Sequence, residues 1–238
     1  MPIQFTNNIE KYMKSEKEKK RKIKEDDKNR NINQVNLSSI PRPSCAEADR
    51  YLKRWNEDEN LLYSDVLLKK LFKETYPENI SVYEIFIKAT ALNSVYSTHV
   101  DSFYSVAQTI LSLNIDERLR DGDETLVGDM LSSLKETIEK EPFSFVTKYC
   151  SFHNPDAFPI YDSYIDKVLW HYKELENFSR YNRNDLDTKH DYSKFKIILA
   201  DFRRWFGLGK YSTKELDQYL WQFGKDYFSK NKRVKADR

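Results

Sequence analysis

Apolar side chains recur at spacings of three and four residues along most of the chain between residues 44 and 228. This period is typical of helices that bury one face, and no stretch shows a convincing strand pattern. The chain of 238 residues contains only five glycines. We therefore predict an all-α fold. The expected helices lie around residues 44–55, 61–75, 82–96, 100–113, 126–140, 143–152, 162–172, 192–206 and 214–228.

Local signals indicate where helices begin and where the chain is irregular. Ser44 with Glu47 has the sequence of a capping box, and Ser212 stands before the last expected helix,. Residues 114–125 and 177–190 are expected to be loops, since they lack a helical period,.

Two of the expected helices make specific predictions about the core. The spacing in helix 61–75 predicts that it buries Leu62, Val66, Leu67 and Leu71,. Helix 82–96 carries apolar residues on most of its sides, which suggests a buried helix,.

The charge distribution predicts one helical domain between two basic ends. Residues 1–40 and 225–238 each carry a net charge of +4, whereas the segment between them carries −6. We expect a tail over 1–40, a helical domain over 41–228 and a second tail over 229–238. Basic ends can add sequence-independent affinity for phosphates. The alternative is that residues 1–40 form a solvated, partly helical tail, because acidic residues are mixed through them.

Several classes of function lose support because their motifs are absent. The chain has no Gly-rich phosphate loop, no HExxH, no CxxC and no nucleophile elbow, and its four histidines share no spacing,. We expect no metal and no cofactor. No apolar run reaches the roughly 20 residues of a membrane span, and the N-terminus lacks the apolar core of a secretion signal. The expected location is the cytoplasm.

One carboxylate stands out in FPIYDSYIDKVLW, residues 158–170. Asp162 follows a short apolar run and precedes an amphipathic helix, so it is well placed to be an N-cap. A carboxylate at a helix N-terminus is also held rigidly and keeps its charge, and such a group can stabilise a developing cation. The two roles are compatible, and both stay open at this point.

The same stretch resembles the region around the catalytic aspartate of the helix-hairpin-helix DNA glycosylases, the superfamily of adenine DNA glycosylase, endonuclease III and 8-oxoguanine glycosylase. The resemblance implies an all-helical, two-lobed protein, with lobe one over about 82–160 and lobe two formed by 44–75 plus 163–228. It also implies an enzyme that flips a damaged or modified base out of DNA and breaks its N-glycosidic bond. Asp162 would then be the catalytic carboxylate.

A second stretch, LNSVYSTHV at residues 92–100, is similar to the family segment that fills the gap left by the flipped base. By that match Tyr96 is the wedge, since base stacking on an aromatic ring stabilises binding by roughly 1–3 kcal/mol. Ser97, Thr98 and His99 would contact DNA beside it. The alternative is that Tyr96 is a core tyrosine.

A third stretch, FSFVTKYCSF at residues 143–152, should correspond to the family's hairpin and the helix after it. Lys148 lies 14 residues before Asp162, closer than is usual for the lysine that attacks the sugar in lyase-active members. An alignment without a gap puts Ser144 at that position instead. The resemblance therefore implies a catalytic Lys148, with Ser144 near the DNA, while a DNA-phosphate or surface role for Lys148 stays open.

The chain departs from the family at the hairpin itself. Where the family has Leu-Pro-Gly-x-Gly, this chain has Glu141-Pro142-Phe143-Ser144-Phe145. It is more similar to bacterial members that lack the glycine hairpin. DNA is the expected partner, as a duplex with a flipped base or as a single strand, and we expect a monomer and no membrane contact. Two alternatives are a non-catalytic DNA-binding module of the same fold, in a defence or regulatory system, and a helical protein-interaction domain.

Overall fold

The computed structural model describes residues 40–98, 100–135, 138, 142–183 and 191–229. The two basic tails therefore lie almost entirely outside the described residues. His99, which was predicted to contact DNA, also lies outside them. The chain divides into two units, residues 1–42 and 43–238, and the fold described here is that of the second unit.

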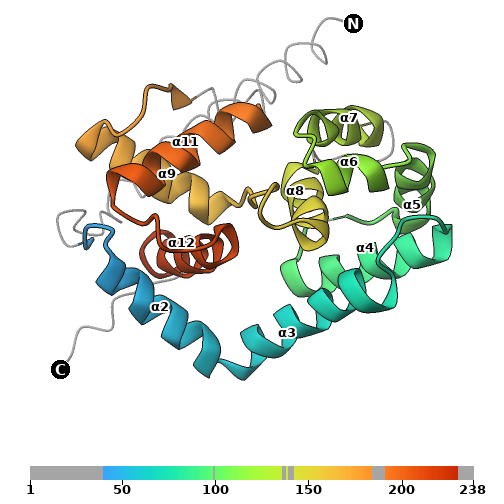
Figure 1. Ribbon diagram of the computed structural model, residues 1–238, viewed down its shortest axis with the longest axis horizontal. Coiled ribbons are helices and arrows are strands. Elements are labelled where there is room, and N and C mark those ends of the chain that lie inside the picture. The colour runs from blue at the N-terminus through green and yellow to red at the C-terminus, as the bar shows by residue number, and fades with distance from the viewer. Residues whose placement is uncertain (1–39, 99, 136–137, 139–141, 184–190, 230–238) are drawn as a thin grey trace, which may run out of the picture. The chain divides into compact units, whose positions relative to one another are not determined.

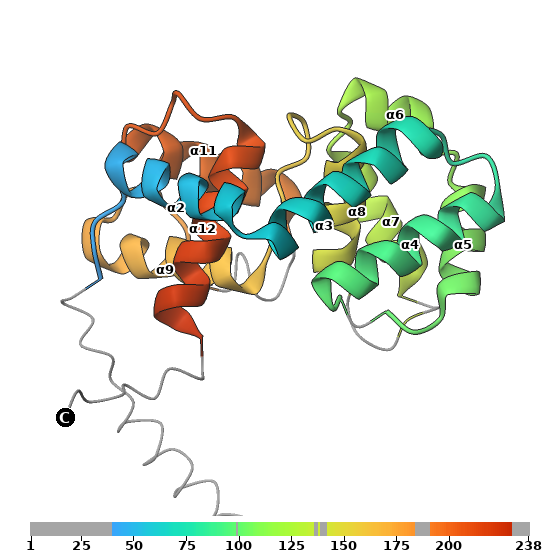
Figure 2. The ribbon, with the colours of Figure 1, turned by 90° about the horizontal axis from the view of Figure 1, so that it is seen from below.

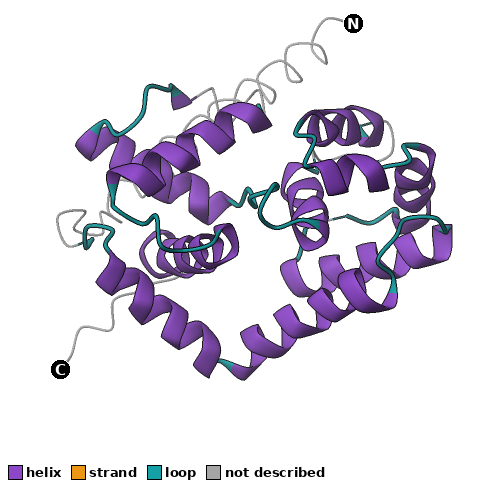
Figure 3. Cartoon of the chain, in the orientation of Figure 1, coloured by secondary structure: helices purple, strands orange, loops and turns teal. Residues whose placement is uncertain are grey.

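All regular structure in the described ranges is helical, as the periodicity predicts, and Figure 3 shows no strand among them. Most helices follow each other through short turns (Figure 1). In chain order they are α2 (Cys45–Glu57), α3 (Glu59–Lys70), the π-helical turn η2 (Leu71–Thr75), α4 (Val82–Tyr96), α5 (Phe103–Ser112), α6 (Asp116–Asp121), α7 (Thr125–Leu134), α8 (Phe143–His153), α9 (Ser163–Glu176), α11 (Tyr192–Trp205) and α12 (Thr213–Phe228).

Side-chain caps fix several helix starts. Ser44 accepts a hydrogen bond from the backbone amide of Glu47, and Asp162 caps α9 in the same manner. Ser212 and Glu215 form a complete capping box at α12. A helix start leaves four amides without partners, and these side chains satisfy some of them. The predicted starts at Ser44, Asp162 and Ser212 are confirmed, but the predicted capping box at Ser44 is only half formed, because the Glu47 side chain pairs with Arg50.

One group of helices is built around α12, which packs mainly on α9 and α2, while α11 packs on α9. Its core is aromatic, and close ring pairs join the helices. The buried rings include Tyr51, Tyr172, Phe202, Tyr219 and Phe223. Helices α9 and α12 approach closely because residue 224 is glycine: a Cβ atom there would lie 2.7 Å from the Cβ and backbone oxygen of Tyr164.

A second group is built around α8, whose residues are all buried except Ser144. Helices α4, α6 and α7 and the turn η2 pack on it, and α5 packs on α4. Figure 2 shows α3 and α4 in front of α8 in that view. Phe72 of η2 contacts the rings of Tyr149 and Phe152, so the end of α3 is fixed to α8 by aromatic packing.

The predicted core of helix 61–75 is wrong for two residues. Val66 is 51% exposed and Leu67 is 56% exposed, whereas Leu68 and Phe72 are the buried residues. The reason is that α3 is apolar on two sides, and a sequence pattern does not say which side is covered. Helix α4 likewise exposes large side chains, although its pattern predicted burial. We call the exposed residues Tyr63, Val66, Leu67, Tyr83, Phe86 and Ile87 the α3–α4 face.

The predicted loop 114–125 is also wrong in part, since it contains the short helix α6. Leu119 is its only buried residue. A single apolar position gives no period, so the sequence pattern could not indicate this helix.

Candidate functional site

Asp162 is both an N-cap and the partner of a buried lysine. Its backbone is extended, with φ −140° and ψ 149°. Oδ1 accepts from the backbone amide of Tyr164 at 2.9 Å, and Oδ2 accepts from Nζ of Lys148 at 3.0 Å. The carboxylate is therefore held at both oxygens while 15% of the side chain still faces solvent.

The loop before α9 is fixed to helices on two sides, and this positions Asp162. The backbone amide of Tyr161 donates to Oγ1 of Thr147 on α8 at 3.2 Å. The hydroxyl of Tyr192 on α11 donates to the carbonyl of Pro159 at 3.0 Å. Because Thr147 directly precedes Lys148, the same turn of α8 aligns both the loop and the lysine.

Lys148 is buried on α8 and reaches three different groups. Its Nζ donates to Asp162 and to the hydroxyl of Ser144, one helical turn earlier. It also lies 5.3 Å from the ring centroid of Tyr96, within the distance of a cation–π contact. Four of the seven residues that the resemblance selected thus lie together in the structure: Asp162, Lys148, Tyr96 and Ser144.

A second lysine approaches the same aromatic ring system from α12. Lys214 forms an ion pair with Asp65 of α3 at 2.8 Å, and its Nζ lies 4.6 Å from the ring centroid of Phe152. The rings of Phe152 and Tyr96 are 6.0 Å apart. The Tyr96 ring beside Lys148 and the Phe152 ring beside Lys214 are thus neighbours, and they lie between the two ammonium groups. We call Lys148, Asp162, Tyr96, Lys214, Asp65 and Asp217 the two-lysine cluster.

Asp217 adds a third carboxyl group to this cluster. The pKa of Asp217 is raised to about 6, mainly by burial; Lys214 and Lys148 lower it, and Asp162 and Asp65 add smaller upward contributions. The cluster thus has three carboxyl groups for two ammonium groups. With a pKa of about 6, Asp217 takes up a proton as the pH falls toward 6, and this proton balances the excess negative charge,.

Burial and neighbouring charges also set the protonation states of Tyr96 and Lys214. It raises the pKa of the Tyr96 hydroxyl, with Lys214 opposing, so Tyr96 is a neutral phenol. Burial would lower the pKa of Lys214, but Tyr96, Asp217 and Asp65 raise it above its ordinary value. The cluster therefore offers a fixed carboxylate at Asp162, a permanent cation at Lys214 and one titrating acid at Asp217.

The remaining residues predicted to contact DNA have other positions. Ser97 is exposed and ends α4 in the left-handed region, with φ 49°. Thr98 donates from its hydroxyl to Oδ1 of Asn93 at 2.8 Å, which holds the turn after α4. His99 lies outside the described residues.

Sequence reasoning missed Asp65, Lys214 and Asp217. Asp65 lies on α3 and the other two lie in the first turns of α12, far from Asp162 along the chain. No motif connects these segments. The weak signal available was the spacing of three between Lys214 and Asp217, which places both on one side of a helix.

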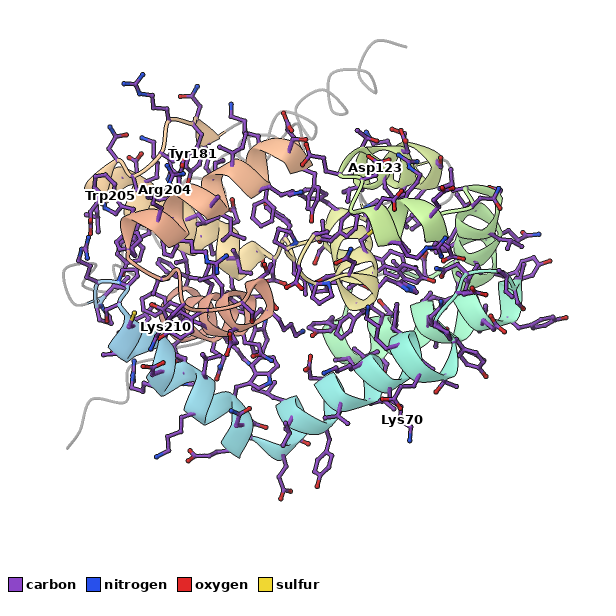
Figure 4. The ribbon with its side chains drawn as sticks, in the orientation of Figure 1. Lys70, Asp123, Tyr181, Arg204, Trp205 and Lys210 are labelled. Atoms are coloured by element: carbon purple, nitrogen blue, oxygen red, sulfur yellow. The ribbon has the colours of Figure 1, made fainter. Side chains whose placement is uncertain are left out.

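A cavity of about 390 Å³ lies elsewhere, between α11, the start of α12 and the loop before α9. Its basic side chains already have partners, since Arg203 donates to the carbonyls of Gly209 and Tyr211 and Arg204 pairs with Asp201. Figure 4 shows Arg204 beside Trp205 at the end of α11. The cavity does not reach Lys148 or Asp162. It is lined by Asp156, Pro159, Lys196, Leu199, Ala200, Arg203, Arg204, Gly209, Thr213 and Leu216.

No group of three or more His, Cys, Asp or Glu side chains in the described ranges is arranged to hold a metal ion. Within the same ranges, no helix combines the length and the apolar composition that crossing a membrane requires.

Comparison with known proteins gives two levels of similarity. The HI_0787_N family model, described as an N-terminal domain, matches residues 47–157. That range includes Asp65, Tyr96 and Lys148 and ends before Asp162. More distantly, origin recognition complex subunit 4 of Cricetulus griseus and of Rattus norvegicus is 23% identical over 184 residues, or 72% of this chain and 42% of the relative.

The chain thus spans less than half the length of these subunits. Solved structures gave no significant match. An uncharacterized protein of Haemophilus influenzae is 41% identical over 167 residues, which cover 70% of this chain and 74% of that protein. This identity over most of both proteins means that the chain belongs to the family of that Haemophilus influenzae protein.

Proposed function

We propose that this protein is a DNA N-glycosylase that flips a damaged or modified base from DNA and releases it. The observation that carries the proposal is the contact between the Lys148 ammonium and the Asp162 carboxylate at 3.0 Å, at the start of α9 and beside the Tyr96 ring. A glycosylase needs a rigid carboxylate at the sugar, a nucleophile within reach and an aromatic group to occupy the vacated stack. The contacts of Lys148 with Asp162 and with the Tyr96 ring support assigning these roles to the three residues.

The chemistry assigned to Asp162 is charge stabilisation. As the bond between the base nitrogen and the sugar C1′ breaks, the electron pair leaves with the base and positive charge develops on the sugar. A fixed carboxylate lowers the energy of that state, and helix capping keeps Asp162 in place without reorganisation. Water then adds to C1′ and loses a proton, and the base takes up a proton. The products are an abasic site and the free base.

Lys148 supports a second route, in which its amine replaces water at C1′ and gives an iminium adduct. The ammonium must first lose a proton, and the Asp162 carboxylate 3.0 Å away is the acceptor in contact with it,. Ser144 holds the lysine from the other side.

The fold is compatible with this proposal in its broad organisation. The helices built around α8 would form one lobe and those built around α12 the other, with DNA entering beside Tyr96. The proposed enzyme uses no cofactor and works in the cytoplasm, on the basis of its sequence. The relatives named as subunits of an origin recognition complex support a role at DNA.

The test is base release from a panel of duplexes that carry uracil, 8-oxoguanine, alkylated purines or mismatched adenine. We expect Asp162→Asn to lower release at least about 100-fold. Asparagine is also a good N-cap, so the fold should be unchanged by circular dichroism. Asp156→Asn, in the loop that leads to Asp162, is the matched control and should keep full activity. Equal release by the wild type and Asp162→Asn would contradict the proposal.

Borohydride reduction tests the lysine separately. An iminium formed by Lys148 would be trapped as a covalent protein–DNA adduct, and Lys148→Ala should abolish the adduct. An adduct of equal yield in Lys148→Ala would remove Lys148 as the nucleophile while leaving the role of Asp162 intact.

A second candidate is a non-catalytic DNA-binding module. The observation that favours it is the acidic segment between the basic ends, together with a hairpin that has lost its glycines. It predicts DNA binding that weakens with salt and upon removal of residues 1–40, with no abasic product from any duplex. Gel-shift titrations on duplex and single-stranded DNA at two salt concentrations distinguish it from a protein-interaction domain, which would bind neither.

A further inference from the structure

The α3–α4 face is exposed although its residues are of the kind that proteins bury. Tyr63 of α3 is 67% exposed and Tyr83 of α4 is 82% exposed, in addition to Val66 and Leu67. Helix α4 packs on α3 and on α8, and Phe72 of η2, directly after α3, contacts the ring of Tyr149 on α8. On each helix most of the exposed residues lie on the side opposite the buried apolar ones, which are Leu68 on α3 and Ile85, Ala89 and Leu92 on α4,. Figure 2 shows both helices in front of α8. Exposed large apolar side chains that gather on two helices packed on each other are typical of an interaction site,.

The area of the face matches what a protein interface requires. A large apolar side chain offers roughly 200 Å², so the exposed parts of these six side chains amount to roughly 700 Å². A stable complex buries about 800 Å² on each partner. The largest apolar patch of a typical monomer is about 300–600 Å².

The charges that border the apolar residues on α3 are self-complementary. Glu59 lies four residues before Tyr63, and Lys70 lies four residues after Val66, so all four share one side of the helix,. Both charged residues are exposed, and neither has an ion-pair partner among the described residues. Figure 4 shows Lys70 projecting outward from α3. An antiparallel copy of α3 would bring Glu59 to Lys70 at both ends, with Tyr63 against Val66 between them.

We propose that the α3–α4 face is the interface of a homodimer, in which α3 of one protomer packs antiparallel to α3 of its partner about a two-fold axis. Such an isologous interface requires a patch that complements itself, and the order Glu59, Tyr63, Val66, Lys70 has this property.

The interface lies on the opposite side of α3 from the two-lysine cluster. Asp65 contacts Lys214 from α3, and around the helix axis it points about 100° away from Val66 and about 140–160° away from Tyr63 and Lys70. Dimerisation therefore leaves the cluster accessible, and the proposal does not depend on the function of that cluster.

The test uses the full chain in sedimentation velocity and light scattering over a concentration series. We expect a dimer in the micromolar range and a monomer for Leu67→Glu. Ile197→Glu, at a residue that is 60% exposed on α11, introduces the same charge elsewhere and should leave the dimer unchanged. If the wild type is still monomeric at a protein concentration about 100-fold above the micromolar range, the proposal is overturned. The face would then serve a different partner.

Charge exchange tests the antiparallel arrangement itself. Glu59→Lys alone and Lys70→Glu alone each place like charges in contact twice, so both should be at least tenfold weaker dimers. Mixing the two variants should restore a heterodimer, because each contact then joins a lysine and a glutamate. The double variant should restore the homodimer. Failure of both the mixture and the double variant to regain dimers would refute the antiparallel arrangement.

Discussion

Two buried lysines of this protein lie in opposite kinds of surroundings. Lys88 on α4 is fully buried and donates to the carbonyls of Tyr76 and Glu78 and to Oδ1 of Asn79. Lys148 on α8 is equally buried but donates to a carboxylate, at Asp162, and to a hydroxyl. One ammonium group is held by neutral acceptors and the other by an opposite charge.

The surroundings of Lys88 form a closed network. Tyr149 and Lys88 both donate to Asn79, and Asn79 and Lys88 approach Nε2 of His153 at 3.3 and 3.4 Å. Burial lowers the pKa of Lys88 to about 8, with Asp116 and Glu84 opposing. Burial, Lys88 and Lys73 lower the pKa of His153 well below its ordinary range, so the ring is neutral.

The comparison indicates that Lys88 is the structural lysine of the two. The Lys88 network joins α4, the turn after η2 and α8, and its polar atoms have partners. The two-lysine cluster contains an excess carboxyl group, at Asp217, with a pKa raised to about 6, and Asp162 is partly open to solvent. An excess titrating group that costs stability is a property of functional sites more than of structural ones.

The largest expected effect on stability comes from replacing the lysines themselves. Lys88→Met should lower the free energy of unfolding by about 3 kcal/mol, because three buried acceptors lose their donor. Lys148→Met should cost only about 1 kcal/mol, since Asp162 keeps its cap hydrogen bond and its access to water. Urea unfolding at pH 7 measures both. An equal or larger loss for Lys148→Met would show that the two-lysine cluster is the structural one.

A smaller effect is expected at Asp217, with the opposite sign. Its pKa is about 6 in the folded protein and about 3.9 in an unfolded chain. The folded state therefore binds more protons between pH 4 and 6, and its stability falls as the pH rises through that window. Asp217→Asn should be about 1–2 kcal/mol more stable than the wild type at pH 7, and no more stable at pH 4.

Urea unfolding at several pH values checks this prediction. Asp156→Asn, at an exposed aspartate, is the control and should show no gain at pH 7. A loss of stability in Asp217→Asn at pH 7 would mean that the carboxylate contributes more through its lysine partners than burial costs.

The smallest expected effect is the contribution of His153 to the loss of stability at low pH. Its folded pKa lies well below the unfolded value of about 6.5,. The unfolded state therefore binds more protons as the pH falls below 6.5, and the folded state loses stability. His153→Gln should remove about 1 kcal/mol of this loss between pH 6.5 and 5.5. The two networks thus respond to acid with opposite signs, and parallel pH profiles for Asp217→Asn and His153→Gln would contradict that contrast.

Local features of the fold were predictable from the sequence, and partnerships across the fold were only partly so. Helix periods and the caps at Ser44, Asp162 and Ser212 depend on neighbouring residues, and they are confirmed. The proximity of Lys148, Tyr96 and Asp162 followed from the resemblance to one family, and their roles stay predictions.

The rest depends on contacts between distant segments. Asp65 and Lys214 meet because α3 and α12 approach each other, and no local pattern encodes that distance. Val66 and Leu67 were predicted to be core residues because they are apolar, but they are exposed. An apolar side chain can be buried, but its sequence context does not show whether another element covers it.

Gly224 has a consequence for variation among relatives. A methyl group at this position would lie 2.7 Å from Tyr164, which is two residues from Asp162 and donates the amide that holds it. Alanine there would move the start of α9, and the carboxylate would move with it away from Lys148. A relative that keeps the aspartate but carries a larger residue at this position would need a compensating change in α9. Position 224 is thus a practical marker for deciding which relatives share this arrangement of the site.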